Sequence, residues 1–318
     1  MGNVIERAVR AALPDRTIDA IDARNTRPGN ETAFVSFVDA DPVYVKTATD
    51  TTRRLVRETA AVRYAAAHCS VAAPAVVAAD PAGDPAYLVT EPLPGTVFNE
   101  RWTGGADREQ LVRRLGTVVA GVQEARFDRP GVITGVDADG LELRATTWTE
   151  TLCETIEWRA SDWFPDRFAD LPGRLVETVR DRDPTLENTT PTLLHGDPSR
   201  INLHLDPDGL LDWERALVGD PAFGVVEAAF HHVGQPDVDD ADEPPLREAL
   251  YEGYRERAGD LPPGLEQNRP LYEAVSYLLV PQAFEDWAPR VDTPNDELAA
   301  DVREEFDARL DRAREAMP

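Results

Sequence analysis

The chain has 318 residues, of which 42% are hydrophobic, and this suffices for a sizeable core divided between two domains. Fifty-nine acidic residues against 33 basic ones give a net charge of −26, which argues against nucleic-acid and membrane partners because phosphate backbones and anionic lipids repel a polyanion. Two cysteines, Cys69 and Cys153, provide neither a disulfide framework nor a four-cysteine zinc site. Since neither a membrane span nor a signal peptide is evident, we expect a cytoplasmic protein in a reducing compartment.

The basic residues are almost all arginine. Lys46 is the one lysine among the 33 basic residues, although lysine is normally a common amino acid. Dispersed acidic residues with lysine nearly absent are typical of adaptation to a salty, halophilic cytoplasm. An ordinary acidic protein remains the alternative.

The first 95 residues are predicted to form an antiparallel β-sheet with one inserted helix. Apolar alternation and turn residues predict strands at 17–23, 32–38, 43–47, 75–79 and 86–90, and helices at 4–13 and 51–68. We assign residues 1–95 to a small β-rich domain, in an α+β fold rather than one of alternating parallel strands.

Helical periodicity dominates after Pro94-Gly95. Apolar residues recur at helical spacing in three stretches: 111–122, 148–156 and 298–310. One strand-rich insert interrupts these helices at residues 192–212, and residues 237–245 are predicted to form an acidic, proline-containing loop. We assign residues 96–318 to a second, mainly helical domain.

The strand-rich insert carries the most unusual polar residues of the chain. Asp197 ends a short apolar run, Asn202 follows five residues later, and Asp212 ends a second short run ten residues beyond Asn202. Two carboxylates and an amide at strand ends can converge on one point, and oxygen ligands of this kind suit Mg²⁺. Asp and Asn also favour turns, which is the structural alternative for each residue taken alone.

The segment His195-Gly196-Asp197 with Asn202 resembles the H-G-D-x-x-x-x-N motif of the aminoglycoside phosphotransferase and choline kinase family, which is protein-kinase-like. The resemblance continues through the segments 212–214 (Asp-Trp-Glu) and 219–221 (Gly-Asp-Pro). It implies a two-lobed kinase-like fold with catalytic and metal-binding loops within 192–221. It also implies that Asp197 is the catalytic base and that Asn202 and Asp212 hold Mg²⁺ against the phosphates of ATP.

A kinase of this kind requires a cation for the nucleotide phosphates on an upstream strand. Lys46 ends the apolar run 43–45, and a compact ammonium contacts phosphate differently from the broad arginine fork. Glu58, in the helix that follows, fits the glutamate that orients such a lysine through an ion pair. An exposed helix acid is the alternative for Glu58.

The linker between the predicted lobes suggests an adenine site. In the resembling fold its backbone reads the base, so the Glu91 carbonyl would accept from the adenine amino group and the Leu93 N–H would donate to the ring. Pro92 and Pro94 have no N–H, which leaves Leu93 as the one donor across these three residues.

The chain departs from the family pattern in three places. The phosphate-covering loop at 27–30 has one glycine and no G-x-G-x-x-G, Gly224 stands where the family often has aspartate, and Ser199 stands where protein kinases have lysine. Arg200 is a candidate to supply the missing charge.

Other polar candidates have simpler interpretations. We expect His195 to be a structural hydrogen-bonding residue. The pair His231 and His232 with the acidic run 237–240 has the composition of a metal site, but a solvated loop is the simpler interpretation.

The sequence therefore predicts transfer of the γ-phosphoryl group of ATP to a hydroxyl of a small molecule such as a sugar, amino sugar or amino alcohol. Acidic residues of the helical lobe, including Glu285 and Asp286, would favour a cationic acceptor, although general surface acidity explains them equally well. A nucleotide-binding pseudokinase without turnover is the main alternative. A kinase acting on proteins is disfavoured, because no activation-loop segment separates Asp212 from Gly219. The oligomeric state is left open.

Overall fold

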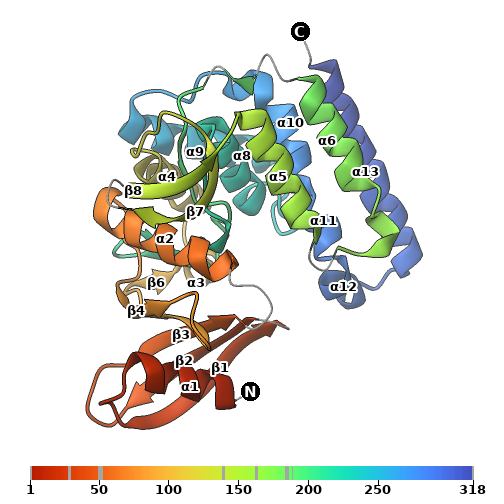
Figure 1. Cartoon of the computed structure of the whole chain (residues 1–318). Coiled ribbons are helices and arrows are strands. Elements are labelled where there is room, and N and C mark those ends of the chain that lie inside the picture. Colours follow the sequence, from red (N-terminus) through yellow and green to blue (C-terminus); the bar gives the residue numbers. More distant parts are fainter. Residues whose placement is uncertain are drawn as a thin grey trace.

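Figure 1 shows the chain in a computed structural model that describes residues 2–27, 30–48, 53–137, 140–161, 164–182, 186–187 and 189–316. A small sheet with the N-terminal helix lies at one end, and the later helices gather at the other. Within the described residues, no helix combines the length and the apolar character needed to span a membrane.

The small sheet is antiparallel, as predicted, with five strands in the order β1-β2-β3-β5-β4. Its elements are α1 (Gly2–Ala12), β1 (Ile18–Arg27), β2 (Asn30–Phe37), β3 (Val43–Ala48), α2 (Arg53–His68), β4 (Val76–Asp80) and β5 (Ala86–Thr90). Side chains alternate along β3: Val43 and Val45 are buried and share a core with Ile5, Ala8 and Val9 of α1. Lys46 has the opposite parity and therefore points to the other face of the sheet.

Helix α2 covers that other face and also reaches the rest of the protein. Leu55, near its N-terminus, packs with Ala86 and Leu88 of β5. Farther along the helix, Ala61 and Ala65 belong to the large hydrophobic core that fills the C-terminal part of the chain. The helix thus connects the small sheet to the larger core, and the division at residue 95 stays a prediction.

The remainder of the chain is mainly helical, with two further small sheets. Its helices are α3 (Phe98–Thr103), α4 (Arg108–Val122), α5 (Trp148–Ser161), α6 (Leu171–Asp181), α8 (Pro221–His232), α9 (Glu243–Ala258), α10 (Leu265–Tyr277), α11 (Leu279–Gln282), α12 (Phe284–Trp287) and α13 (Asn295–Glu315). The short strands are β6 (Thr96–Val97), β7 (Gly131–Asp137), β8 (Gly140–Ala145), β9 (Thr192–Leu194), β10 (Leu203–Leu205), β11 (Gly209–Leu210) and β12 (Leu217–Gly219), and a 3₁₀ turn, η2 (Trp213–Arg215), precedes β12. These strands pair in the orders β11-β10-β6 and β8-β7-β12-β9.

Two predictions for this region were wrong. The insert at 192–212 is not the one strand-rich segment, because β7 and β8 form a hairpin that extends the sheet of β9 and β12. The acidic loop ends earlier than predicted, because α9 already begins at Glu243 and the first turn of a helix tolerates proline. The hairpin matters for the site, since it extends the sheet of β9, which precedes Asp197, and of β12, which follows Asp212.

Candidate active site

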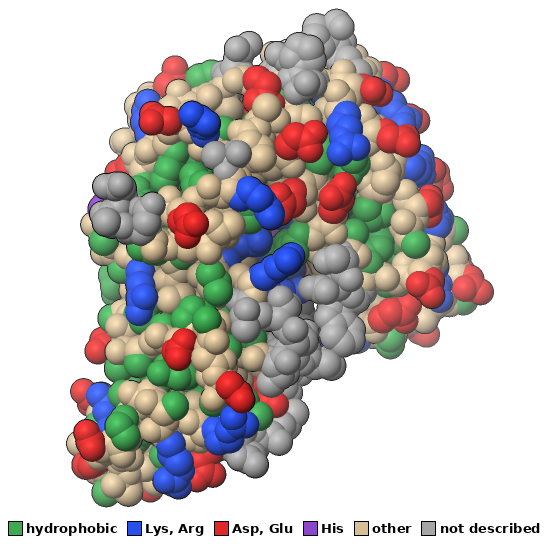
Figure 2. Space-filling model, viewed as in Figure 1, with side chains coloured by type: hydrophobic (Ala, Val, Ile, Leu, Met, Phe, Trp, Pro, Cys, Tyr) green, Lys and Arg blue, Asp and Glu red, His purple; other side chains and the backbone are tan. Residues whose placement is uncertain are grey.

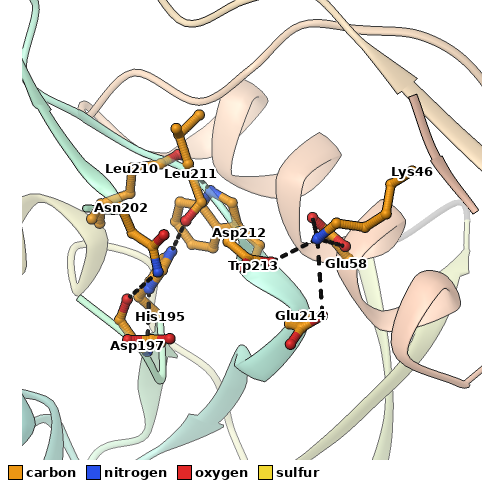
Figure 3. Close-up of polar contacts among 10 residues, drawn as sticks. All are labelled: Lys46, Glu58, His195, Asp197, Asn202, Leu210, Leu211, Asp212, Trp213 and Glu214. Atoms are coloured by element: carbon orange, nitrogen blue, oxygen red, sulfur yellow. Dashed lines mark hydrogen bonds and ion pairs between the residues drawn. The ribbon is translucent and has the colours of Figure 1, made fainter. Parts of the chain in front are cut away.

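The three polar residues of the strand-rich insert lie close together, because each borders a short paired strand (Figure 3). Asp197 lies in the loop after β9, and Asp212 follows β11. The Asn202 side-chain amide donates to the Asp197 carbonyl at 3.1 Å, and the Asn202 carbonyl accepts from the N–H of Leu211 at 2.8 Å. Asn202 is thereby hydrogen-bonded to both segments that carry the carboxylates.

His195 and Gly196 fix the shape of this loop. Nδ1 of His195 accepts from the N–H of Asp197 at 3.3 Å, and Nε2 donates to the Leu211 carbonyl at 2.9 Å. Burial lowers the pKa of His195, which favours the neutral ring that this pattern requires. Gly196 has φ +78°, and a Cβ there would collide with the Arg215 carbonyl. His195 thus has the hydrogen-bonding role predicted for it.

Asp197 lies beside a histidine to which the sequence analysis gave no role. His231 of α8 brings Nε2 to 3.5 Å from Oδ1 of Asp197. Burial raises the pKa of Asp197, but His231, Arg215 and His195 together lower it below the ordinary aspartate value. Burial also lowers the pKa of His231 to about 4, so its ring is neutral at pH 7. An ionised Asp197 at neutral pH is what a general base requires.

The ammonium of Lys46 lies among three carboxylates (Figure 3). Its Nζ is 2.8 Å from both carboxylate oxygens of Glu58, 2.7 Å from Oδ1 of Asp212 and 3.9 Å from Oε2 of Glu214. Burial lowers the pKa of Lys46, yet Asp212, Glu58 and Glu214 raise it well above the ordinary value overall. Lys46 is therefore charged, and it meets the glutamate that the sequence analysis paired with it.

The carboxylates around Lys46 outnumber the single ammonium. One oxygen each of Glu58, Asp212 and Glu214 lies within 4.8 Å of the others. Burial raises the pKa of Glu58 to about 7, and the neighbouring Asp212 and Glu214 act in the same direction against Lys46. Such an excess of hard oxygen donors fits a divalent cation such as Mg²⁺. Glu214 belongs to the recognised segment 212–214, but its part in this cluster was not predicted.

The backbone at Asp212 directs its side chain towards this cluster. Asp212 adopts the left-handed conformation, with φ 61° and ψ 64°, immediately before η2. Few residues other than glycine adopt this conformation, and aspartate is among the more tolerant ones. Strain of this kind is concentrated at functional sites.

Comparison with known proteins identifies the family of this chain. A model of the phosphotransferase enzyme family matches residues 28–271, which is most of the chain. The chain belongs to this family. No curated protein matches it significantly by sequence.

Solved structures of this family share the fold. A protein from Thermobifida fusca described as a fructosamine-3-kinase aligns with a TM-score of 0.62 and 16% identity over 99% of both chains. A choline/ethanolamine kinase family protein from Mesorhizobium loti aligns with a TM-score of 0.58 and 19% identity, over 100% of this chain and 95% of that one.

A macrolide 2′-phosphotransferase from Brachybacterium faecium aligns with a TM-score of 0.57 and 18% identity, over 95% of this chain and 98% of that one. At these identities the likeness establishes the fold alone, and it confirms the predicted kinase-like architecture.

The backbone of the linker is only partly hydrogen-bonded within the described residues. The Glu91 N–H donates to the Ala75 carbonyl at 2.9 Å, while the Leu93 side chain is buried. Within the described part of the chain, the Leu93 N–H has no hydrogen-bond partner. Pro28 and Gly29, in the suggested phosphate loop, lie outside the described residues. The nucleotide contacts of Glu91 and Leu93 stay predictions.

Arg200 does not have the position suggested for it. Its guanidinium donates to Asp237 at 2.7 Å and to the His232 carbonyl at 2.8 Å, and it stacks on Trp102 with Cζ 3.8 Å from the ring centroid. His232 in turn donates from Nε2 to the Pro198 carbonyl at 2.7 Å. These contacts attach the loop of Asp197 to α3 and α8, so Arg200 anchors the loop, and the cation that acts on Asp197 is Arg215.

The two buried histidines of α8 make stability depend on pH. Burial lowers the pKa of His232 to about 3, against an ordinary value of about 6.5. Below pH 6.5 the unfolded chain therefore binds more protons than the folded one, and stability is lost as the pH falls towards the folded pKa. The variant His232→Gln retains an N–H donor for Pro198 but cannot titrate. Between pH 6.5 and 5, we expect the free energy of unfolding of the variant to fall less steeply than that of the parent, and the two slopes to differ by about 1 kcal/mol per pH unit.

Urea titrations of both proteins at several pH values in this range give the dependence of the free energy of unfolding on pH. The surface carboxylates contribute equally in the two proteins, so their contribution cancels in the difference between the two slopes. Parallel pH profiles would show that His232 is not buried in its neutral form.

Proposed function

We propose that this protein transfers the γ-phosphoryl group of ATP to a hydroxyl of a small molecule, with Mg²⁺ as the metal. The observation that carries the proposal is the ammonium of Lys46, which contacts both Glu58 of α2 and Asp212 beyond β11. Asn202 links the loop of Asp197 to the strand end before Asp212. These contacts support the proposal, because they connect the residues proposed as base, metal ligands and phosphate cation although these come from distant parts of the chain.

Each residue has one role in this proposal. Asp197 accepts the proton of the attacking hydroxyl and holds that hydroxyl in line with the phosphoryl group. Asp212 and Asn202 hold Mg²⁺, with Glu214 as a further oxygen donor, and Lys46 contacts the nucleotide phosphates. When bound, Mg²⁺ neutralises part of the phosphate charge. Leu93 N–H and Glu91 C=O bind the adenine.

Loss of the base is the first test. In Asp197→Asn the side chain keeps its shape but cannot accept a proton, so turnover should fall by at least about 100-fold while ATP binding survives. ATP consumption in high salt is measured with sugars, amino sugars, amino alcohols, hydroxy acids and homoserine as acceptors. Near-normal turnover of the variant would remove Asp197 from the mechanism. Nucleotide binding by the parent without ATP consumption for any acceptor would instead identify a pseudokinase.

The metal role of Asp212 has its own test. Asp212→Asn removes a charged ligand, so the affinity for the nucleotide should lose most of its dependence on Mg²⁺. Calorimetric titration of an ATP analogue with and without Mg²⁺ measures this dependence, and the exposed Asp292→Asn serves as the matched control. Equal Mg²⁺ dependence in Asp212→Asn and the parent would exclude Asp212 as a ligand.

The single lysine supplies a third test. Lys46→Arg keeps the charge, but the planar guanidinium is wider than an ammonium and cannot occupy the same position among Glu58, Asp212 and the phosphates. We expect kcat/KM to drop at least tenfold, about 1.4 kcal/mol of transition-state stabilisation, with the fold intact.

An amine-specific reagent checks the same role, because Lys46 and the N-terminus are its two targets. ATP with Mg²⁺ should protect Lys46 and leave the N-terminus reactive. Full activity of Lys46→Arg, or labelling that ATP leaves unchanged, would show that Lys46 does not contact the phosphates.

A further inference from the structure

Arginines from two separate elements surround the half-buried Trp158 of α5. The guanidinium carbons of Arg57 and Arg54, both on α2, lie 5.0 and 5.2 Å from the Trp158 ring centroid. The guanidinium carbon of Arg215, at the end of η2, lies 5.9 Å from the same centroid. We call these four residues the Trp158 arginine cluster.

A narrow pocket opens at this cluster, between α2, β7, α5 and the segment around η2. Among the described residues, its charged lining consists of three arginines, Arg57, Arg159 and Arg215, and one acid, Glu154. Figure 2 shows blue side chains gathered in the middle of the visible face, between the small sheet and the helical part. In a chain with a net charge of −26, this concentration of positive charge is unusual.

Two acids near the pocket already form ion pairs with arginines. Glu154 forms an ion pair with Arg144, and the fully buried Glu227 forms one with Arg159. Arg159 nevertheless keeps Nε and Nη1 buried without a hydrogen-bond partner among the described residues, and so does Nε of Arg57. Unpartnered buried donors are costly, and a ligand that accepts hydrogen bonds would remove that cost.

The local potential also points to an anion. Burial together with the charges of Arg54 and Arg144 lowers the pKa of Arg57 to about 10, against the opposing effect of Glu214. The N–H edges of a guanidinium group match the paired oxygens of carboxylate and phosphate.

The pocket and Asp197 have one arginine in common. Arg215 lines it, and the charge of the same residue lowers the pKa of Asp197. Gly196, the residue before Asp197, packs directly against the Arg215 backbone. On the other side, Arg57 immediately precedes Glu58, which holds Lys46. A molecule bound at the cluster would therefore reach Asp197 with its neighbouring groups.

We infer that the Trp158 arginine cluster binds an anionic group of the acceptor, a carboxylate or a phosphate, and so presents the acceptor hydroxyl to Asp197. The acceptor is then a hydroxy acid or a phosphorylated alcohol, rather than the cationic amino compound that surface acidity alone would favour. That the ligand is a phosphoryl acceptor rests on the proposed function. That the cluster binds an anion does not.

A binding experiment tests the cluster without turnover. Calorimetry in the presence of a non-hydrolysable ATP analogue and Mg²⁺ compares glycerate, glycerol 3-phosphate and uncharged glycerol at constant ionic strength. At least one anion should bind tenfold or more tightly than glycerol, and the two anions distinguish carboxylate from phosphate. Arg57→Gln should abolish the preference, whereas Arg63→Gln, at an exposed position of the same helix, should keep it.

Arg54→Gln serves as a second variant if Arg57→Gln does not fold. The inference is wrong if neither anion binds more tightly than glycerol, or if both cluster variants retain the preference.

Kinetics separate this inference from the proposed function. Among acceptors with comparable hydroxyls, the anionic ones should be phosphorylated with the highest kcat/KM. Arg57→Gln should raise the KM for them at least tenfold while the KM for ATP changes little. Phosphorylation of amino alcohols in preference to hydroxy acids would overturn the inference and leave the proposed function intact. If no acceptor is phosphorylated, the proposed function fails, and the binding experiment still decides whether the cluster is an anion site.

Discussion

The ion cluster around Lys46 is the constraint on which the rest of the site depends. It joins β3, α2 and the segment after β11, which lie up to 166 residues apart in the chain. Burying charges is costly even when they are paired, and a pair kept for stability alone would be balanced. Here three carboxyl groups face one ammonium in a half-buried place, and the raised pKa of Glu58 reflects this excess of acid. Such an excess of acid fits the proposed divalent cation, and the left-handed backbone of Asp212 is a second feature that is common at functional sites.

Local patterns in the sequence sufficed for most of the fold, because the strands of the small sheet alternate clearly and end at turn residues. They failed for the hairpin of β7 and β8, where the register shifts between Ile133 and Gly135 and interrupts the alternation. The sequence pattern also predicts too late an end for the acidic loop, because proline favours loops. Pro244 and Pro245 instead lie in the first turn of α9.

In the site, too, residues close in sequence could be predicted, whereas contacts between distant segments could not. Asp197, Asn202 and Asp212 are close in sequence, so their spacing was informative, and the resemblance supplied the partnership of Lys46 and Glu58. The positions of His231 and Arg215 relative to Asp197 depend on how α8 and η2 pack, which no spacing records. Arg200 shows the converse: its place in the motif suggested a role towards the phosphates, but the packing of Trp102 and Asp237 holds it elsewhere.

The two sides of the site have opposite charge, and this arrangement matters in an acidic protein. Carboxylates predominate around Lys46 and guanidinium groups around Trp158, with Asp197 held between them by His231 and Arg215. Exposed pairs such as Arg113 with Glu256 are screened by salt and contribute little to stability. Groups as buried as Glu58, Lys46 and Arg159 are screened far less. The electrostatic pattern of the site would therefore persist at salt concentrations that suppress the repulsion among the surface acids. A chain with a net charge of −26 can thus keep a local attraction for anions where its acceptor binds.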